Sequence, residues 1–189
     1  MILSTIRNAL AAIHPEKIFE TDYARKGFSL DVTVSADRIE EAVAVVDQNG
    51  FFIETITGVD WLGEKAAQQK EAAAKVAEKA DAGAEDAATG KDEPLAPGAG
   101  NQVEPLVDDM EVIYDFNHYS DFCRVVIRVR IPRNAPKLKT ISKIYPAALW
   151  HERETHDFFG IKFTGHPYLV PLLLPEDADF HPLLKDFNK

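Results

Sequence analysis

The sequence predicts a two-layer α+β domain, in which a mixed or antiparallel sheet of four to five strands has helices on one face and an extended C-terminal tail. Three observations lead to this fold class. Hydrophobic residues make up 46% of the 189 residues, which is enough for a core. Segments that alternate apolar and polar residues, as half-buried strands do, stand beside segments with the three-to-four spacing of amphipathic helices. A polar, alanine-rich stretch interrupts this pattern at 64–105.

The N-terminal part of the chain has the order helix, strand, helix, strand. Its first apolar residues recur every three or four positions, which predicts an amphipathic helix that ends before Pro15. Residues 28–36 alternate strictly and predict a strand. Ser35 can then cap a helix that Gly50 ends. Residues 51–61 predict the second strand.

Further regular elements follow residue 105. Residues 110–117 and 122–131 predict two strands, and the short connection between them indicates an antiparallel hairpin. A charged helix is predicted to begin with Pro146 at its first position and to end before Gly160.

Residues 64–105 predict an insertion in one continuous domain. This stretch contains 13 alanines and no aromatic residue, which is typical of a partly helical spacer followed by disorder. A docking arm for another subunit is the functional alternative. We therefore expect a single domain made of 1–63 and 106–160, with 161–189 as a tail that contacts a partner.

Charge and cysteine content exclude several classes of protein. The net charge of −10 argues against a nucleic-acid binder, which needs a basic surface. The single cysteine, Cys123, excludes an intrachain disulfide framework and an iron–sulfur cluster ligated by this chain alone. No apolar run reaches the roughly 20 residues that span a bilayer. We expect no direct transmembrane segment, so that any membrane association comes through a partner.

The strand at 122–131 has two chemically different faces. Apolar residues alternate with Arg124, Arg128 and Arg130, which share one face. A solvated sheet face is the simpler interpretation, because charged side chains usually point outward. The functional alternative is a contact with an acidic patch on a partner subunit.

The helix before Gly160 mixes charged and aromatic side chains. At about 100° per residue, Trp150, Glu154 and Asp157 fall on one side, with Arg153 beside them. Carboxylates among aromatic rings need partners. The spacing therefore predicts an ion pair between Arg153 and Asp157, and a cation or backbone donors for Glu154. Such a helix indicates a specificity device or an interface.

A rival hypothesis is an independent metal-dependent hydrolase that uses His151, Glu152 and His156. The zinc-peptidase motif needs two histidines four residues apart, so that both reach one metal from the same helix face. Here they are five residues apart, which is about 140° around the helix. The sequence favours a chain with no catalytic residue, metal ligand or cofactor of its own. A stand-alone adaptor is a third class.

The residues after Gly160 predict an extended segment, because prolines and glycines are frequent there. The pairs His166-Pro167 and His181-Pro182 favour extended backbone at each histidine. Isolated histidines of this kind are more often hydrogen-bonded anchors than metal ligands. An apolar, proline-rich tail normally lies against its own domain or against a neighbouring protein.

Motifs in the C-terminal third resemble the signature of a known family. These motifs are Glu152-Arg-Glu-x-x-Asp157-Phe-Phe-Gly160-Ile-x-Phe-x-Gly165-His-Pro167, Pro175-Glu-Asp177 and His181-Pro-Leu-x-Lys185-Asp186. Together with Ile56-Thr-Gly-Val-Asp60-Trp, they are similar to the 30 kDa subunit of complex I, which in bacteria is the C subunit of NADH–quinone oxidoreductase.

The resemblance implies a structural subunit in the peripheral arm of an oxidoreductase that couples NADH–quinone electron transfer to ion pumping. It implies contact with a 49 kDa-type subunit that resembles the large subunit of nickel–iron hydrogenases, with an iron–sulfur small subunit and with other peripheral-arm subunits. Iron–sulfur clusters, and flavin with NADH or a nickel–iron centre, are expected in those partners. The implied location is the cytoplasmic side of the inner or plasma membrane. The same role in an energy-converting, membrane-bound hydrogenase, with ferredoxin and protons, is the alternative.

We expect Arg153, Glu154 and Asp157 to lock the charged helix, and the two His-Pro pairs to anchor the tail. The residues expected at the interface or in the structural motif are Arg128, Arg130, Trp150, Glu152, Arg153, Glu154, Asp157, Gly160, Gly165, His166, Pro167, Pro175, Asp177, His181, Pro182, Lys185 and Asp186.

Overall fold

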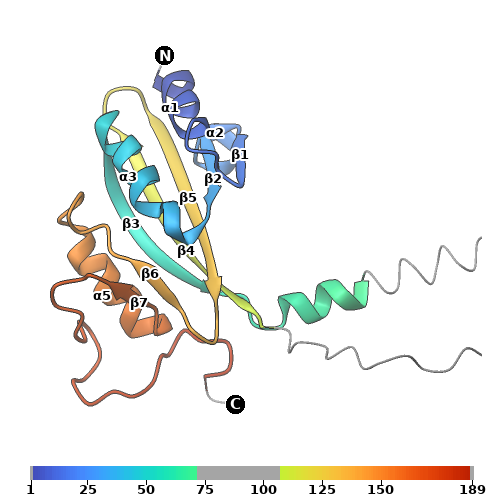
Figure 1. Ribbon diagram of the computed structural model, residues 1–189, viewed down its shortest axis with the longest axis vertical. Coiled ribbons are helices and arrows are strands. Elements are labelled where there is room, and N and C mark those ends of the chain that lie inside the picture. Colours follow the sequence, from blue (N-terminus) through green and yellow to red (C-terminus); the bar gives the residue numbers. More distant parts are fainter. Residues whose placement is uncertain (1, 72–106, 188–189) are drawn as a thin grey trace, which may run out of the picture. The chain divides into compact units, whose positions relative to one another are not determined.

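The computed structural model describes residues 2–71 and 107–187 (Figure 1). Residues up to 62 and from 109 onward belong to one compact unit, and residues 63–108 to another. In the second unit, the predicted spacer begins as a helix over residues 64–71. The stretch that we predicted to be disordered lies outside the described residues.

A five-stranded mixed sheet forms the centre of the larger unit and confirms the predicted α+β class. Its strands lie in the order β1-β2-β5-β4-β3. Their bounds are Lys17–Glu20 for β1, Leu30–Val34 for β2, Phe51–Asp60 for β3, Asp109–His118 for β4 and Cys123–Pro132 for β5. Neighbouring strands are antiparallel except β2 and β5, which run parallel with Leu30 opposite Val125.

The β4–β5 hairpin and the β3–β4 pair are the longest ladders of the sheet. The pairs of the hairpin run from His118 opposite Cys123 at the turn to Asp109 opposite Pro132 at the open end. The predicted hairpin is therefore confirmed. Because side chains alternate across a strand, Val125 and Ile127 of β5 enter the core, while the arginines point to the opposite face.

Two helices bury their apolar stripes against the sheet. The helices of the larger unit are α1 (Ile2–Ala11), α2 (Tyr23–Lys26), α3 (Ile39–Gln48) and α5 (Ala148–Phe159). Ile6 of α1 and Val43 of α3 belong to the same core as Ile127, and Figure 1 shows α3 lying across the sheet. Ser35 precedes a 3-10 turn and makes no side-chain cap. The predicted capping role is therefore wrong, and the Ser35 side chain instead lowers the pKa of the exposed Asp37 carboxyl.

A second, two-stranded parallel sheet pairs β6 (Lys137–Lys139) with β7 (Lys162–Thr164), on either side of α5 in the chain. Gly160 ends α5 in the left-handed conformation, with φ 71°, as predicted. Pro146 lies two residues before the helix rather than at its first position. Between 165 and 187, the chain forms turns, bends and irregular backbone without a helix or strand. None of the described helices is long and apolar enough to cross a membrane.

Candidate functional site

The charged helix α5 is fixed along the edge strand β3. The Thr155 hydroxyl donates a hydrogen bond of 3.2 Å to the Ile56 carbonyl. The Phe159 ring covers Gly58 so closely that a Cβ atom at Gly58 would lie 2.6 Å from it. A glycine is needed at this close approach, and the contact places α5 where it can present its remaining faces to the tail.

Glu152 holds the start of α5 to the segment that follows β6. Its side chain is fully buried and accepts hydrogen bonds from the Thr140 hydroxyl at 2.5 Å and the Ile141 N–H at 2.8 Å. Burial, opposed by these two donors, raises the pKa of Glu152 to about 7. The Tyr114 hydroxyl is buried without a hydrogen-bond partner among the described residues. Its burial, together with the charge of Glu152, raises the pKa of Tyr114.

The geometry of these residues differs from that of a zinc hydrolase. The Glu152 carboxylate points into the core, whereas His151 is half-buried. His156 donates from Nδ1 to the Ile161 carbonyl at 2.9 Å. Within 2–71 and 107–187, no three side chains of His, Cys, Asp or Glu are grouped as metal ligands would be.

Arg153 binds the tail through two backbone carbonyls. Its Nε donates to the Val170 carbonyl at 2.9 Å and its Nη2 to the Pro171 carbonyl at 2.6 Å. The guanidinium also lies 5.5 Å from the centre of the Trp150 ring and 5.6 Å from that of Tyr168. These are cation–π distances, so two rings and two carbonyls hold this one cation.

Asp157 binds the next tail residues through their amides. One carboxylate oxygen accepts hydrogen bonds from the N–H groups of Leu172, Leu173 and Leu174 at 2.7, 2.8 and 3.2 Å. Burial opposes the charge, but these three donors outweigh it and hold the pKa of Asp157 below its usual value. The predicted ion pair between Arg153 and Asp157 is therefore wrong, because each side chain binds the tail instead.

The two histidines of the His-Pro pairs also bind backbone groups. His166 Nδ1 accepts the Tyr168 N–H at 3.1 Å, so its Nε2 carries the proton and donates to the Leu149 carbonyl at 3.2 Å. His181 donates from Nδ1 to the Asp157 carbonyl at 2.8 Å. Its ring lies against Gly160, where a Cβ atom would approach it within 2.6 Å.

The end of the tail is held at the open end of the β4–β5 hairpin. The buried Asp60 carboxylate accepts two hydrogen bonds from Arg133, at 2.8 and 3.0 Å, and one from the Lys185 N–H at 2.9 Å. Arg133 also bonds Asp186 at 2.6 Å. Burial opposes the Asp60 charge, but Arg133 and the backbone donors hold the Asp60 pKa below its usual value. No sequence pattern pointed to Arg133.

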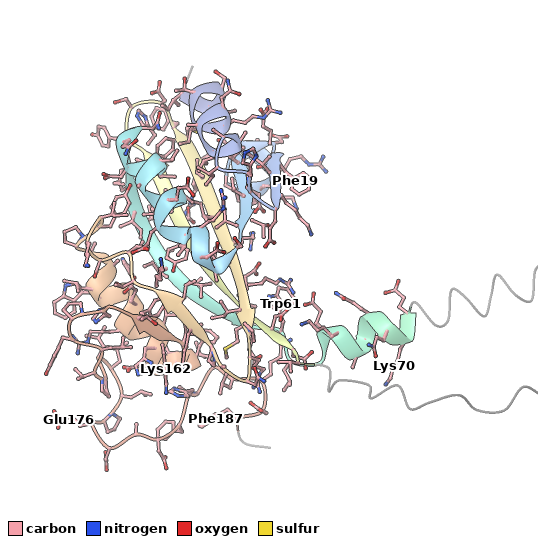
Figure 2. All side chains as sticks on the ribbon, in the orientation of Figure 1. Phe19, Trp61, Lys70, Lys162, Glu176 and Phe187 are labelled. Atoms are coloured by element: carbon pink, nitrogen blue, oxygen red, sulfur yellow. The ribbon has the colours of Figure 1, made fainter. Side chains whose placement is uncertain are left out.

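The tail thus turns its backbone toward the domain and many of its apolar side chains outward. Figure 2 shows Glu176 at the outer bend of this segment and Phe187 near its end. The exposed large side chains of α5 and the tail are Trp150 (60%), Tyr168 (65%), Leu173 (62%), Phe180 (41%), Leu183 (53%) and Phe187 (37%). A cavity of about 220 Å³ lies between Trp150, Arg153 and Tyr168.

The arginine row on β5 is paired within its own sheet. Arg124 bonds Glu54 at 2.6 Å and Asp115 at 2.7 Å. Arg128 bonds Asp31 at 2.9 Å, and Glu111 lies within 4 Å of both Arg128 and Arg130. The row is an ion-paired sheet face, with its charges largely compensated.

The remaining predicted interface or motif residues differ in burial and in backbone conformation. Glu154 is half-buried, and Pro175 and Asp177 are exposed. Gly165 adopts φ 89°, which permits the turn into the first His-Pro pair. Pro167 lines the cavity beside Trp150, and Pro182 directly follows the His181 anchor.

A family model ties this site to a known group of proteins. The model for the respiratory-chain NADH dehydrogenase 30 kDa subunit matches residues 32–189, which include α5 and the whole tail. The chain belongs to this family. The resemblance found in the sequence motifs is thereby confirmed.

Curated relatives match over shorter stretches. The C subunit of NADH-quinone oxidoreductase from Roseiflexus sp. (strain RS-1) is 42% identical over 76 residues, which cover 40% of this chain and 44% of the relative. The C subunit of the F(420)H(2) dehydrogenase from Methanosarcina mazei is 37% identical over 85 residues, covering 44% of this chain and 54% of the relative. The chain thus spans about half the length of these relatives.

Solved structures share the fold. A trypsin-resistant fragment of Nqo5 is 23% identical with a TM-score of 0.57, covering 89% of this chain and all of the fragment. A chain of the membrane-bound sulfane sulfur reductase, an archaeal respiratory membrane complex, is 20% identical with a TM-score of 0.65. That match covers 98% of this chain and 84% of the other.

Proposed function

We propose that this chain is a non-catalytic structural subunit in the peripheral arm of a membrane-bound, complex I-type oxidoreductase. In this role, α5 and the tail dock the chain onto a subunit that resembles the large subunit of nickel–iron hydrogenases. One observation carries the proposal: the tail binds its own domain with backbone groups and leaves several of its large apolar side chains exposed.

The energetics of this arrangement favour an interface. Exposed apolar patches of more than a few hundred Å² are uncommon on monomeric proteins and mark interaction sites. Aromatic residues and arginine are enriched at the centres of interfaces, and Trp150, Arg153 and Tyr168 surround one cavity here. A partner that covers the tail would remove this apolar surface from water.

The redox chemistry belongs to the partners under this proposal. Iron–sulfur clusters, and flavin with NADH or a nickel–iron centre, would reside in the hydrogenase-like subunit, the iron–sulfur small subunit and other subunits of the arm. The complex would lie on the cytoplasmic side of the inner or plasma membrane, where this chain is a peripheral component.

A related branch is the second candidate. The relatives include the C subunit of an F(420)H(2) dehydrogenase, and the structural neighbours include a chain of a sulfane sulfur reductase. An energy-converting membrane-bound [NiFe] hydrogenase, using ferredoxin and protons, would need the same scaffold. The docking surface would be unchanged, and the co-purifying subunits distinguish the two branches.

Affinity purification from the native membrane tests the proposal. The tagged full chain is expected to bring down a hydrogenase-like subunit and an iron–sulfur subunit, with NADH–quinone reductase activity if the complex is of the complex I type. Replacing Leu173 and Leu183 together with serine is expected to reduce that recovery about tenfold, the effect of losing an interface hot spot. Phe19→Ser, which removes an exposed ring on β1, serves as the control.

Two outcomes would contradict the proposal. One is undiminished recovery of the complex with the Leu173 and Leu183 variant, provided that the control also assembles normally. The other is turnover of a hydrolysable substrate by the isolated chain with stoichiometric zinc, which would favour the hydrolase hypothesis.

A further inference from the structure

The turn of the β4–β5 hairpin carries two exposed aromatic rings. It is formed by residues 119–122 between the paired residues His118 and Cys123. The exposed fractions are 86% for Tyr119 and 81% for Phe122. Burying a side chain of this size in a partner is worth roughly 1.5–3 kcal/mol, so both rings are left without most of that stabilisation in this chain.

The backbone of this turn makes the choice of phenylalanine unfavourable. Phe122 has φ 47°, in the left-handed region. Hairpin turns that need this conformation usually place glycine or asparagine there. For a bulky residue the conformation costs about 1–2 kcal/mol. Neither the local backbone nor packing among the described residues therefore accounts for an aromatic ring at this position, whereas a contact outside the chain would.

The surroundings of the turn extend this apolar surface. A cavity of about 270 Å³ beside it is lined by Phe122 together with Ile2, Leu3 and Cys123. Phe52, at the start of β3, is 42% exposed at the same end of the sheet. The patch is thus formed by several elements that the fold brings together at one end.

This end of the hairpin is remote from the anchor of the tail. Asp60, which holds Lys185 and Arg133, pairs with Met110 near the open end of the hairpin. A ten-residue strand such as β4 separates the two ends by about 30 Å. The turn therefore offers a contact separate from the tail's C-terminal anchor.

The charges around the turn indicate the chemistry of its partner. Asp121 is exposed beside the two rings, with His118 3.1 Å away. Beneath them, Arg124 is shared by two carboxylates, Glu54 and Asp115. Among these residues the carboxylates outnumber the single arginine, so negative charge is in excess around the two exposed rings. Complementary potentials favour a partner with basic residues around its apolar pocket, and an anionic lipid surface would be repelled.

We infer that the turn at Tyr119–Phe122 inserts its two aromatic rings into an apolar pocket, edged with arginine or lysine, on a second subunit of the complex. The chain then bridges two partners, one at the tail and one at this turn. The inference rests on the proposed function for the presence of a complex, and goes beyond it by adding a second interface.

Variants of the full chain separate strain from binding. Phe122→Gly removes the ring and the backbone strain together, so the thermal midpoint of the isolated chain is expected to stay the same or rise. Recovery of the second subunit is expected to fall about tenfold, as for loss of a hot-spot ring. Tyr119→Ser is expected to lower it in the same way. Phe19→Ser is the matched control, because it also removes one exposed ring.

Photo-crosslinking from position 119 identifies the contact. A benzoylphenylalanine at this site is expected to crosslink to one protein subunit, at a position next to arginine or lysine residues of that subunit. The same crosslink is expected in the otherwise wild-type chain and in tail variants that still assemble. Crosslinks to lipid, or Phe122-dependent sedimentation with vesicles of phosphatidylcholine and phosphatidylglycerol, would overturn the inference. If the Phe122 and Tyr119 variants recover the second subunit as well as the wild type does, the inference about the turn is wrong but the proposed function stands. If the wild-type chain co-purifies with no other subunit, the proposed function is wrong as well.

Discussion

Arg153 and Asp157, one helical turn apart on α5, bind consecutive parts of the same tail segment with opposite polarity. The cation donates to the carbonyls of Val170 and Pro171, and the anion accepts from the amides of residues 172–174. A segment outside any strand has no ladder to satisfy its backbone groups. The two charges of α5 take the place of that ladder.

Asp157→Ala is expected to release the middle of the tail while leaving the sheet folded. The change removes the acceptor of three N–H groups, and a hydrogen bond to a charged group contributes about 1.5–3 kcal/mol. Because the freed amides can bind water, we expect a loss of about 2–4 kcal/mol in local opening free energy, measured by hydrogen exchange at residues 172–174. Glu154→Ala is the control on the same helix. Unchanged protection in the Asp157 variant would contradict this account.

Gly160→Ala is expected to destabilise the protein more than Gly27→Ala. Both glycines have left-handed backbone, with φ of 71° and 78°, so both variants lose about 1 kcal/mol from backbone strain. At Gly160 the added Cβ also meets the His181 ring at 2.6 Å, whereas no described atom lies within 4 Å at Gly27. Chemical denaturation of both variants measures the difference. Equal losses would show that His181 moves away at no cost.

Glu152→Gln is expected to flatten the dependence of stability on pH. The pKa of Glu152 rises from 4.5 when unfolded to about 7 in the folded chain. The folded state therefore holds the proton more tightly, so its contribution is complete below pH 4.5 and is lost as pH rises through about 7. The wild type should lose about 3 kcal/mol across this window. Urea denaturation at about pH 5 and pH 8 measures it, and parallel curves for the variant and wild type would refute the assignment.

Arg133→Ala is expected to cost about 3–5 kcal/mol in unfolding free energy, because it removes the bidentate partner of a buried carboxylate. The Asp60 side chain is only 1% exposed and would keep the Leu62 and Lys185 amides as donors. Lys185→Ala is the matched control, since the bond from residue 185 comes from its backbone N–H. If both variants unfold at the same denaturant concentration, the Arg133–Asp60 pair does not stabilise the fold.

Strand prediction succeeded where one face of the strand is buried. The alternation at 28–36 and in the hairpin reflects residues such as Val32 and Ile127, which are fully buried. The edge strand β1 has an almost wholly exposed four-residue pattern, so its sequence carries no period-two signal. The three-residue strands β6 and β7 each bury a single residue, which is too little to form a pattern.

The candidate site was predictable in its composition but not in its pairing. Charges among aromatic rings pointed to α5 as the candidate site, because such residues need partners. The spacing of residues along a helix identifies neighbours on that helix only, and it therefore led to the prediction of an ion pair between Arg153 and Asp157. The real partners are backbone groups of the tail, which leave no trace in side-chain identity. The buried Glu152 carboxylate likewise accepts its hydrogen bonds from Thr140 and Ile141. Only the tertiary fold brings these two residues next to Glu152.

The parallel pairing of β2 with β5 has a consequence for synthesis on the ribosome. On one side β2 pairs with the nearby β1, but on the other side Leu30 pairs with Val125, which follows β3, the inserted segment and β4 in the chain. Contacts so distant in sequence slow folding, since a long loop must close before they form. A nascent chain that has emerged only through β3 exposes the unpaired side of β2 with its apolar residues. This half-made protein is the stage at which we expect the greatest need for a chaperone.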